Sequence, residues 1–180
     1  MEVTCLKPTN ENLLRMTCES TMNNPVESKM SLAGIYNCEH SPIRSQIFVI
    51  KMEGIPSFVS VHFVRHKVGV EHFVQTMRED RGATEVADRN TPVNHTMIAN
   101  AQAIINMAKK RLCYKASDKT REVFNLVVDA IALVDIELPK FLVPECIYRG
   151  GYCHEPRICG RVDGVVWAGP KTRFFKRYGL

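Results

Sequence analysis

The feature that most constrains the fold is a helical spacing of apolar residues through the second half of the chain. From Thr96 onward the apolar positions of one helix face are Met97, Ala101, Ile104, Ile105, Ala108 and Leu112. After a break around 114–117, Asp118 can cap a second helix with the apolar positions Val123, Leu126, Val127, Ala130, Ile131 and Val134. Spacings of three and four residues are typical of amphipathic helices. The sequence therefore predicts two long helices in succession, ended by Pro139 and Pro144.

The first half alternates between strand-like and helix-like segments. Alternating or continuous apolar residues predict strands over 2–7, 45–52 and 70–78, of which 45–52 is apolar on both faces, as a central strand would be. Capping residues and apolar spacing predict helices over 11–22, 27–37 and 57–67. The polar stretch from 78 to 93 contains Gly82 and Pro92 and is the best candidate for a loop that faces a substrate.

Length and composition favour one soluble domain with an anionic partner. The chain has 180 residues, of which 45% are hydrophobic, and its formal net charge is +5. This size supports one well-buried core. The positive charge favours a nucleotide, a nucleic acid or a phosphorylated cofactor as partner. Apolar runs are too short to cross a membrane and the first residues lack a signal pattern, so we expect a cytoplasmic protein that does not contact a membrane.

A basic and aromatic tail ends the chain. Its cations are Lys171, Arg173, Lys176 and Arg177, and they alternate with Phe174, Phe175 and Tyr178. Such a tail can contact a nucleic acid or a phosphate, or it can be a solvated terminus.

Three of the seven cysteines gather in one short segment. Cys146, Cys153 and Cys159, together with His154, lie in a stretch rich in Gly and Pro. Thiolates and imidazole are the ligands that zinc prefers, so these four residues are a candidate structural zinc site. The alternative is a loop of reduced or paired cysteines. We expect residues 141–180 to form an extension and not an independent domain.

Cationic groups recur in three separated segments of the chain. Arg65, His66 and Lys67 follow each other at the end of a predicted helix, His40 precedes them, and Arg111 and Arg121 follow. Three such segments suit one anionic ligand. The structural alternatives are a solvated basic face, a favourable interaction with the helix dipole, and ion pairs of Arg111 and Arg121 with Asp118 or Glu122.

The order of these segments resembles the flavin-dependent thymidylate synthases. Glu39 and His40, the strand 47–52, Pro56 and a helix ending in Arg65-His66-Lys67 follow the order of that family, whose hallmark begins Arg-His-Arg. The later segment with Arg111, Ala116 and Arg121 is similar to the family's Arg, Ala-Gln and Arg on its C-terminal helix pair. Lys67, Val70 and Ser117 stand where the family has Arg, Ser and Gln. The resemblance implies an α+β fold, with a small mixed sheet and a long helix pair, over residues 1–140.

The resemblance also implies an activity and its site. The expected reaction is the reductive methylation of dUMP to dTMP, with methylenetetrahydrofolate, FAD and NADPH, in a homotetramer with shared active sites. The residues implied for FAD are His40, Arg65, His66, Lys67 and Arg111. The residues implied for dUMP are Gln75, Thr76, Arg78 and Arg121, because guanidinium groups suit a phosphate dianion, and Arg121 is also the expected catalytic residue.

Two other functions remain open at this point. One is a related enzyme that modifies another pyrimidine nucleotide at C5. The other is a non-enzymatic, zinc-containing nucleic-acid-binding module that uses the Cys/His segment and the basic tail. Bound flavin supports an enzyme, whereas bound zinc without flavin supports the module.

Overall fold

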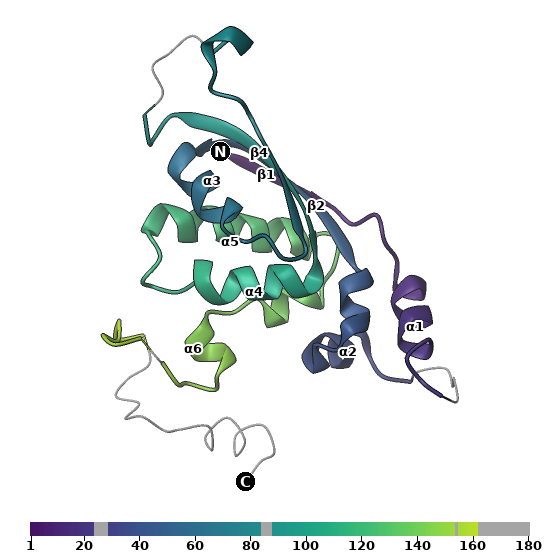
Figure 1. Ribbon diagram of the computed structural model, residues 1–180. Helices are drawn as coiled ribbons and strands as arrows, with labels where there is room; N and C mark the ends of the chain where they lie inside the picture. The colour runs from purple at the N-terminus through teal and green to yellow at the C-terminus, as the bar shows by residue number, and fades with distance from the viewer. Residues whose placement is uncertain (24–28, 84–87, 154, 162–180) are drawn as a thin grey trace.

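A four-stranded antiparallel sheet is the centre of the computed structural model, which describes residues 1–23, 29–83, 88–153 and 155–161 (Figure 1). Its strands, in the spatial order β1-β2-β4-β3, are β1 (Glu2–Leu6), β2 (Ile47–Pro56), β4 (Pro92–Asn100) and β3 (Val70–Val74). Every neighbouring pair is antiparallel. The predicted α+β class is therefore confirmed, but the sheet is antiparallel and not mixed.

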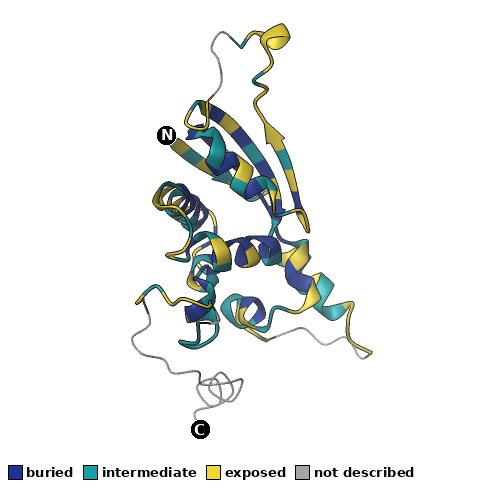
Figure 2. Cartoon of the chain, turned by 60° about the vertical axis from the view of Figure 1, so that its left-hand side comes forward, coloured by how far each residue is buried: buried dark blue, intermediate teal, exposed yellow. Residues whose placement is uncertain are grey.

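One face of the sheet carries the core. Side chains on β2 and β4 alternate between buried and more exposed positions, with Phe48, Ile50, His95 and Met97 fully buried (Figure 2). The two strands pair Ile50 with Met97, so the buried positions of both lie on the same face. Helices α3 (Ser57–Val64), α4 (Ala101–Arg111) and α5 (Asp118–Ala132) pack in this region.

The two long helices begin at side-chain caps that the sequence supplies. The Asn100 side chain accepts a hydrogen bond from the backbone N–H of Ala103, and the Ser117 side chain accepts one from Thr120. Such caps satisfy N–H groups that have no partner within the helix. The second cap is Ser117 and not the predicted Asp118, which is the first residue of the helix.

Short helices connect these elements. They are α1 (Glu11–Glu19), α2 (Leu32–Cys38), η1 (Ser41–Ser45), η2 (Glu79–Arg81), η3 (Leu138–Phe141) and α6 (Glu145–Tyr148). Strand β1 and helices α1, α3 and α5 confirm predicted elements within a few residues at each end. The predicted helix 27–37 begins only at Leu32 in the described chain, and residues 24–28 lie outside it.

The largest error of the sequence analysis concerns residues 92–100. We predicted the end of a loop followed by the start of a helix, whereas the chain forms strand β4 here and α4 begins at Ala101. Val93, His95, Met97 and Ala99 recur at every second position, which is a strand pattern. The pattern was missed because Met97 and Ala101 also fit the helical spacing that continues after Ala101. Strand β2 also continues through a bulge between Met52 and Ile55, beyond the predicted end of the strand at residue 52.

Among the described residues, no helix is long and apolar enough to span a membrane. The basic tail from 162 to 180, with its Lys171, Arg173, Lys176 and Arg177, lies outside the described residues.

Candidate functional site

Arg111 and His66 join the two segments that carried the family resemblance. His66 follows the end of α3, and Arg111 is the last residue of α4. Arg111 donates a hydrogen bond from Nε to Nε2 of His66 at 2.9 Å. An arginine can only donate, so His66 accepts at Nε2, and its neutral ring carries the proton on Nδ1.

Gly69 allows the chain after His66 to lie against the start of α4. Its φ is +72°, and the backbone N–H of Asn100 donates to its carbonyl at 3.0 Å. A Cβ at Gly69 would lie 2.4 Å from Nδ2 of Asn100, the capping residue of α4. Glycine is therefore required here both for its backbone conformation and for the close approach.

A chain of hydrogen bonds leads from His66 into the core. Nε2 of His72 lies 2.8 Å from the backbone oxygen of His66, Nδ1 of His72 lies 2.9 Å from Nε2 of His95, and Nδ1 of His95 lies 3.0 Å from Oγ of Ser60. We call these four residues the histidine cluster. His72 and His95 are diagonal neighbours on strands β3 and β4, which pair Val74 with His95.

The bonding partners fix the protons of the neutral histidine cluster. The carbonyl of His66 can only accept, so His72 donates from Nε2 and accepts at Nδ1. His95 then donates from Nε2 to His72, and its Nδ1 accepts from the hydroxyl of Ser60. With all three imidazoles neutral, each hydrogen bond from Ser60 to the carbonyl of His66 has one donor and one acceptor.

Burial keeps the inner histidines neutral. Burial and then the nearby His72 lower the pKa of His95 to about 4. Burial, Arg111 and His72, in that order, lower the pKa of His66 to about 4. Burial and the charge of Arg65 lower the pKa of Arg111. The site thus has a neutral imidazole interior beneath the cations Arg65 and Arg111.

Arg65 and Lys67 line an open cavity beside this cluster. Its volume is about 340 Å³, and its wall includes Val61, Val64 and Val74. Both cations are exposed, while His66 is half-buried. Four of the predicted flavin residues, Arg65, His66, Lys67 and Arg111, therefore belong to one neighbourhood of the fold.

The other predicted ligand residues lie in separate cavities. His40 is exposed beside a cavity of about 430 Å³ that Met30, Cys38 and Pro42 also line. Gln75 and Thr76 line a third cavity of about 250 Å³.

The side chains near this third cavity already have partners. Oε1 of Gln75 accepts from the backbone N–H of Asn94, and the guanidinium of Arg78 forms an exposed ion pair with Asp80 at 2.6 Å.

Arg121 stabilises the turn between α4 and α5. Its Nη1 donates to the carbonyl oxygens of Tyr114 and Ala116 at 3.0 and 2.7 Å, and its Nη2 pairs with Asp118. Its guanidinium also lies 5.1 Å from the ring centre of Tyr114. The structural alternative for Arg121, an ion pair with Asp118, is thus present.

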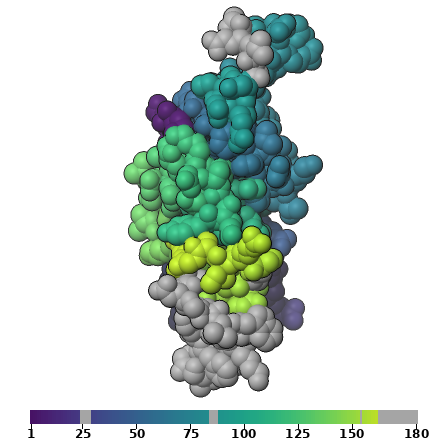
Figure 3. Space-filling model, turned by 90° about the vertical axis from the view of Figure 1, so that its left-hand side faces the viewer, coloured from purple at the N-terminus to yellow at the C-terminus, as the bar shows by residue number. Residues whose placement is uncertain are grey.

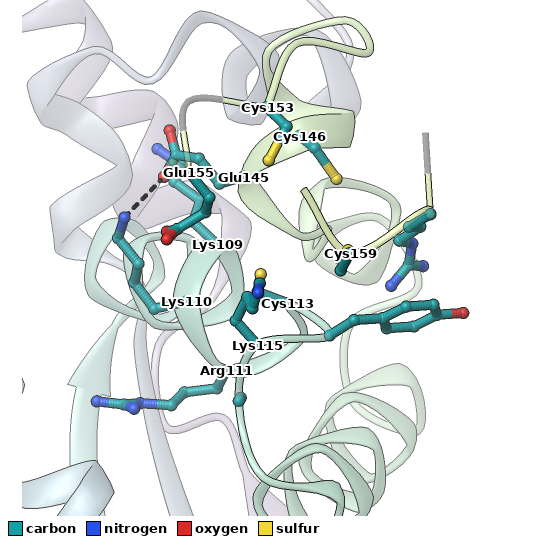
Figure 4. A pocket seen from close by; sticks show the side chains of 13 residues that line it. Lys109, Lys110, Arg111, Cys113, Lys115, Glu145, Cys146, Cys153, Glu155 and Cys159 are labelled. Atoms are coloured by element: carbon teal, nitrogen blue, oxygen red, sulfur yellow. Dashed lines mark ion pairs between the residues drawn. The ribbon is translucent and has the colours of Figure 1, made fainter. Parts of the chain in front are cut away.

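Four cysteines line a cavity of about 270 Å³ at the C-terminal end of α4 (Figure 4). They are Cys113, Cys146, Cys153 and Cys159. Among the described residues, no group of three or more His, Cys, Asp or Glu side chains is arranged as a metal site. His154, the fourth member of the predicted zinc set, lies outside the described residues.

The sequence analysis gave no role to His72, His95 or Ser60. His95 could have been found from the sequence, because it lies at an apolar position of the alternating pattern over residues 93–99. We interpreted this stretch as the end of a loop and the start of a helix. His62 is half-buried on α3, and its Nδ1 lies 2.9 Å from Oγ1 of Thr120.

Comparisons with known proteins identify the fold. No protein-family model matches the sequence, and no curated protein matches it. Two crystal structures of thymidylate synthase X (ThyX) from Helicobacter pylori, both described with FAD and dUMP, match with TM-scores of 0.61 and 0.62 at 12% sequence identity. The matches cover 79% of this chain and 99% and 100% of the ThyX chains. This chain therefore has the fold of the flavin-dependent thymidylate synthase ThyX.

Proposed function

We propose that the protein binds FAD and a pyrimidine nucleotide and acts as a thymidylate synthase of the flavin-dependent type. The observation that carries this proposal is the hydrogen bond between Arg111 and His66. It connects, within a ThyX-like fold, the two sequence segments that resemble the family. The implied reaction is the reductive methylation of dUMP, with methylenetetrahydrofolate as carbon donor and NADPH as reductant.

The residues around His66 fit an anionic cofactor. Arg65 and Lys67 are exposed cations, and Arg111 lies behind them with a pKa lowered by burial and by Arg65. An anion between Arg65 and Arg111 would relieve the repulsion between the two cations, and the pyrophosphate of FAD is such an anion. The bound flavin supplies hydride transfer, while these side chains hold and orient it.

The arginines proposed to bind dUMP could contact its phosphate, but they differ in how far their present contacts within the protein must change. Arg121 uses three of its five N–H donors in the turn, which leaves two for a ligand. Arg78 is held by an exposed ion pair with Asp80, and such pairs contribute only about 0–1 kcal/mol, so it can exchange partners easily. We keep Arg121 as the proposed catalytic contact, with Gln75, Thr76 and Arg78 as further dUMP ligands.

Assembly would explain why the proposed ligands line separate cavities in one chain. His40 and Arg65 contribute to different cavities. In a homotetramer with shared active sites, His40 of one subunit can complete the site of another. We also propose a cytoplasmic location, and residues 141–180 as an extension of the catalytic domain 1–140.

The altered motif favours a second candidate within the same chemistry. Lys67 and Val70 replace family residues next to the proposed site, where the choice of substrate would be set. A related C5 modification of another pyrimidine nucleotide is therefore the alternative substrate choice.

Flavin binding is the decisive test. FAD is added to the purified protein, and quenching of flavin fluorescence gives its affinity. We expect binding that weakens about tenfold or more in Arg111→Gln, because a charged hydrogen-bonding partner contributes about 1.5–3 kcal/mol. The matched control is Lys110→Gln, which removes the same charge from the neighbouring residue and should retain the affinity. Absence of flavin binding by the folded native protein, with zinc bound instead, would favour the nucleic-acid-binding module.

Calorimetry with dUMP and with other pyrimidine monophosphates then separates the two enzymatic candidates. The thymidylate synthase proposal requires dUMP to bind the flavin-loaded protein most tightly.

A further inference from the structure

The cavity at the end of α4 brings together cysteines from two distant parts of the chain. Cys113 follows α4, while Cys146, Cys153 and Cys159 belong to the segment 145–161, which we call the cysteine segment. Figure 3 shows the cysteine segment, in yellow-green, lying against the surface of the preceding helices. In Figure 4 the four cysteines surround the same cavity.

A glycine turn returns Cys153 toward Cys146. Gly150 and Gly151 have φ values of +69° and +98°, and the N–H of Gly151 donates to the carbonyl of Cys146 at 2.7 Å. Two successive residues with positive φ favour glycine at both positions. Cys146 and Cys153 line the same cavity as Cys113, so the turn keeps the two thiols of the segment on the side that faces the end of α4.

Arg161 holds the other end of the cysteine segment beside Cys113. Its Nη1 donates to the carbonyl of Leu112 at 3.2 Å, and its guanidinium lies 4.5 Å from the ring centre of Tyr114. Leu112 and Tyr114 are the two neighbours of Cys113, and Arg161 follows Cys159 by two residues. These two contacts therefore place Cys159 near Cys113.

The cysteine segment has little apolar burial of its own. Cys146 is its only buried residue among those described, and Ile147 and Ile158 are about half exposed. Its further contacts include Tyr148, which is partly buried against the core and has the Lys109 ammonium 3.6 Å from its ring centre, and the Lys110–Glu145 pair at 3.7 Å. Short segments without a core generally need a metal or a covalent link to stay folded.

We propose that Cys113, Cys146, Cys153 and Cys159 bind one zinc ion as a structural four-thiolate site. The proposal replaces His154 of the sequence-based set by Cys113, so the ion would connect the cysteine segment to the end of α4. On binding, each thiol releases its proton to solvent and forms a Zn–S bond of about 2.3 Å, without any redox step.

The surroundings of the cavity suit the charge of such a site. One Zn²⁺ and four thiolates carry a net charge of −2. The cavity wall supplies the cations Lys109, Lys110, Arg111, Lys115 and Arg161, against the two carboxylates Glu145 and Glu155. The thiols do not yet form a coordinating set. Zinc binding would therefore require the four cysteine side chains to reorient within the cavity that they line.

Zinc content and cobalt spectroscopy test this site. Protein purified under reducing conditions without chelators should contain about one zinc per chain by elemental analysis. Replacement by cobalt should give the intense thiolate-to-cobalt absorption of a four-thiolate site. A native protein that stays metal-free after zinc is added to its reduced form, or a cobalt spectrum of fewer than three thiolates, would overturn the proposal.

Substitutions identify the fourth ligand. Cys113→Ser should weaken zinc binding at least about tenfold in competition with a chromophoric chelator, because one thiolate ligand is lost. His154→Ala and the matched cysteine control Cys38→Ser should keep the native affinity. Full zinc affinity in Cys113→Ser together with its loss in His154→Ala would overturn the assignment. Because native zinc content is measured independently, misfolding of Cys113→Ser does not remove the test.

Discussion

The histidine cluster and the cysteine segment both contact residues at the end of α4, and they are organised in opposite ways. His95 and Ser60 are buried, and each hydrogen bond in the chain from Ser60 to Arg111 joins two groups of the protein itself. The thiols of the cysteine segment instead line a cavity surrounded by cations. The hydrogen bonds of the histidine cluster form without a ligand. The cysteine segment instead supplies thiols that an ion could bind.

This difference predicts opposite responses to added positive charge. A proton added to the histidine cluster is unfavourable, because it charges a buried ring next to Arg111 and other imidazoles. Under the zinc proposal, a divalent ion added to the thiols is favourable, because it replaces protons on four cysteines that line one cavity. Stability measured against pH and against zinc therefore separates the two regions.

The largest effect is expected from His95→Leu. This change leaves the buried hydroxyl of Ser60 without its acceptor and Nδ1 of the partly buried His72 without its donor. The loss of both partners costs roughly 2–5 kcal/mol, measured as the free energy of unfolding in urea. The exposed His40→Leu serves as control, with a change within about 0.5 kcal/mol. The loss in His95→Leu should be the same with and without zinc, and a loss that depends on zinc would mean that the two regions are coupled.

The next effect is the acid sensitivity of the histidine cluster. The pKa values of His66 and His95 are lowered to about 4, so between pH 6.5 and 4 the unfolded chain binds more protons than the folded one. Stability is fully present above about pH 6.5 and is lost as the pH falls to about 4, by on the order of 2–3 kcal/mol for the fully buried His95.

Unfolding at a series of pH values, with zinc removed by a chelator, checks this prediction. His95→Leu should lose a large part of the slope. An unchanged slope in this variant would show that another group causes the acid sensitivity.

The sequence predicted helices and strands whose apolar residues follow one clear spacing. It missed the strand whose alternating spacing continues directly into the spacing of a helix. Helix α5 and strand β1 have unambiguous spacing, and both were found. Strand β4 was missed because its alternating buried residues run directly into the helical spacing of α4, with only Asn100 between them. The predicted mixed sheet failed with it, because the two central strands are β2 and β4.

The candidate site shows the same limit. Arg65, His66 and Arg111 were found because the family motif orders them along the chain. His95 and Ser60 were missed because their contacts depend on the packing of α3 on β4, which sequence spacing does not reveal. Cys113 was given no role because it lies 33 residues before Cys146, and only the fold brings it to the same cavity.

A smaller effect is expected on the pKa of His66 in Arg111→Gln. Burial is the first cause of the low pKa and is retained, but the nearby positive charge is removed. The pKa of His66 should therefore rise from about 4 toward, but not to, the ordinary value of about 6.5. NMR titration of the imidazole resonances measures this, with Lys110→Gln as the charge-matched control. A pKa that stays at about 4 would show that Arg111 does not influence the histidine cluster in solution.

The smallest effect is expected from Arg78→Gln, which belongs to neither region. Its guanidinium and Asp80 are both more than half exposed and only two residues apart, so water and salt screen their attraction. The free energy of unfolding should change by less than about 0.5 kcal/mol, and its dependence on pH and on zinc should match the native protein. This variant therefore gives the baseline against which the responses of the histidine cluster and the cysteine segment are compared. Because its folding is intact, a fall of about tenfold in dUMP affinity by calorimetry would report a lost phosphate contact alone, and an unchanged affinity would remove Arg78 from the proposed nucleotide site.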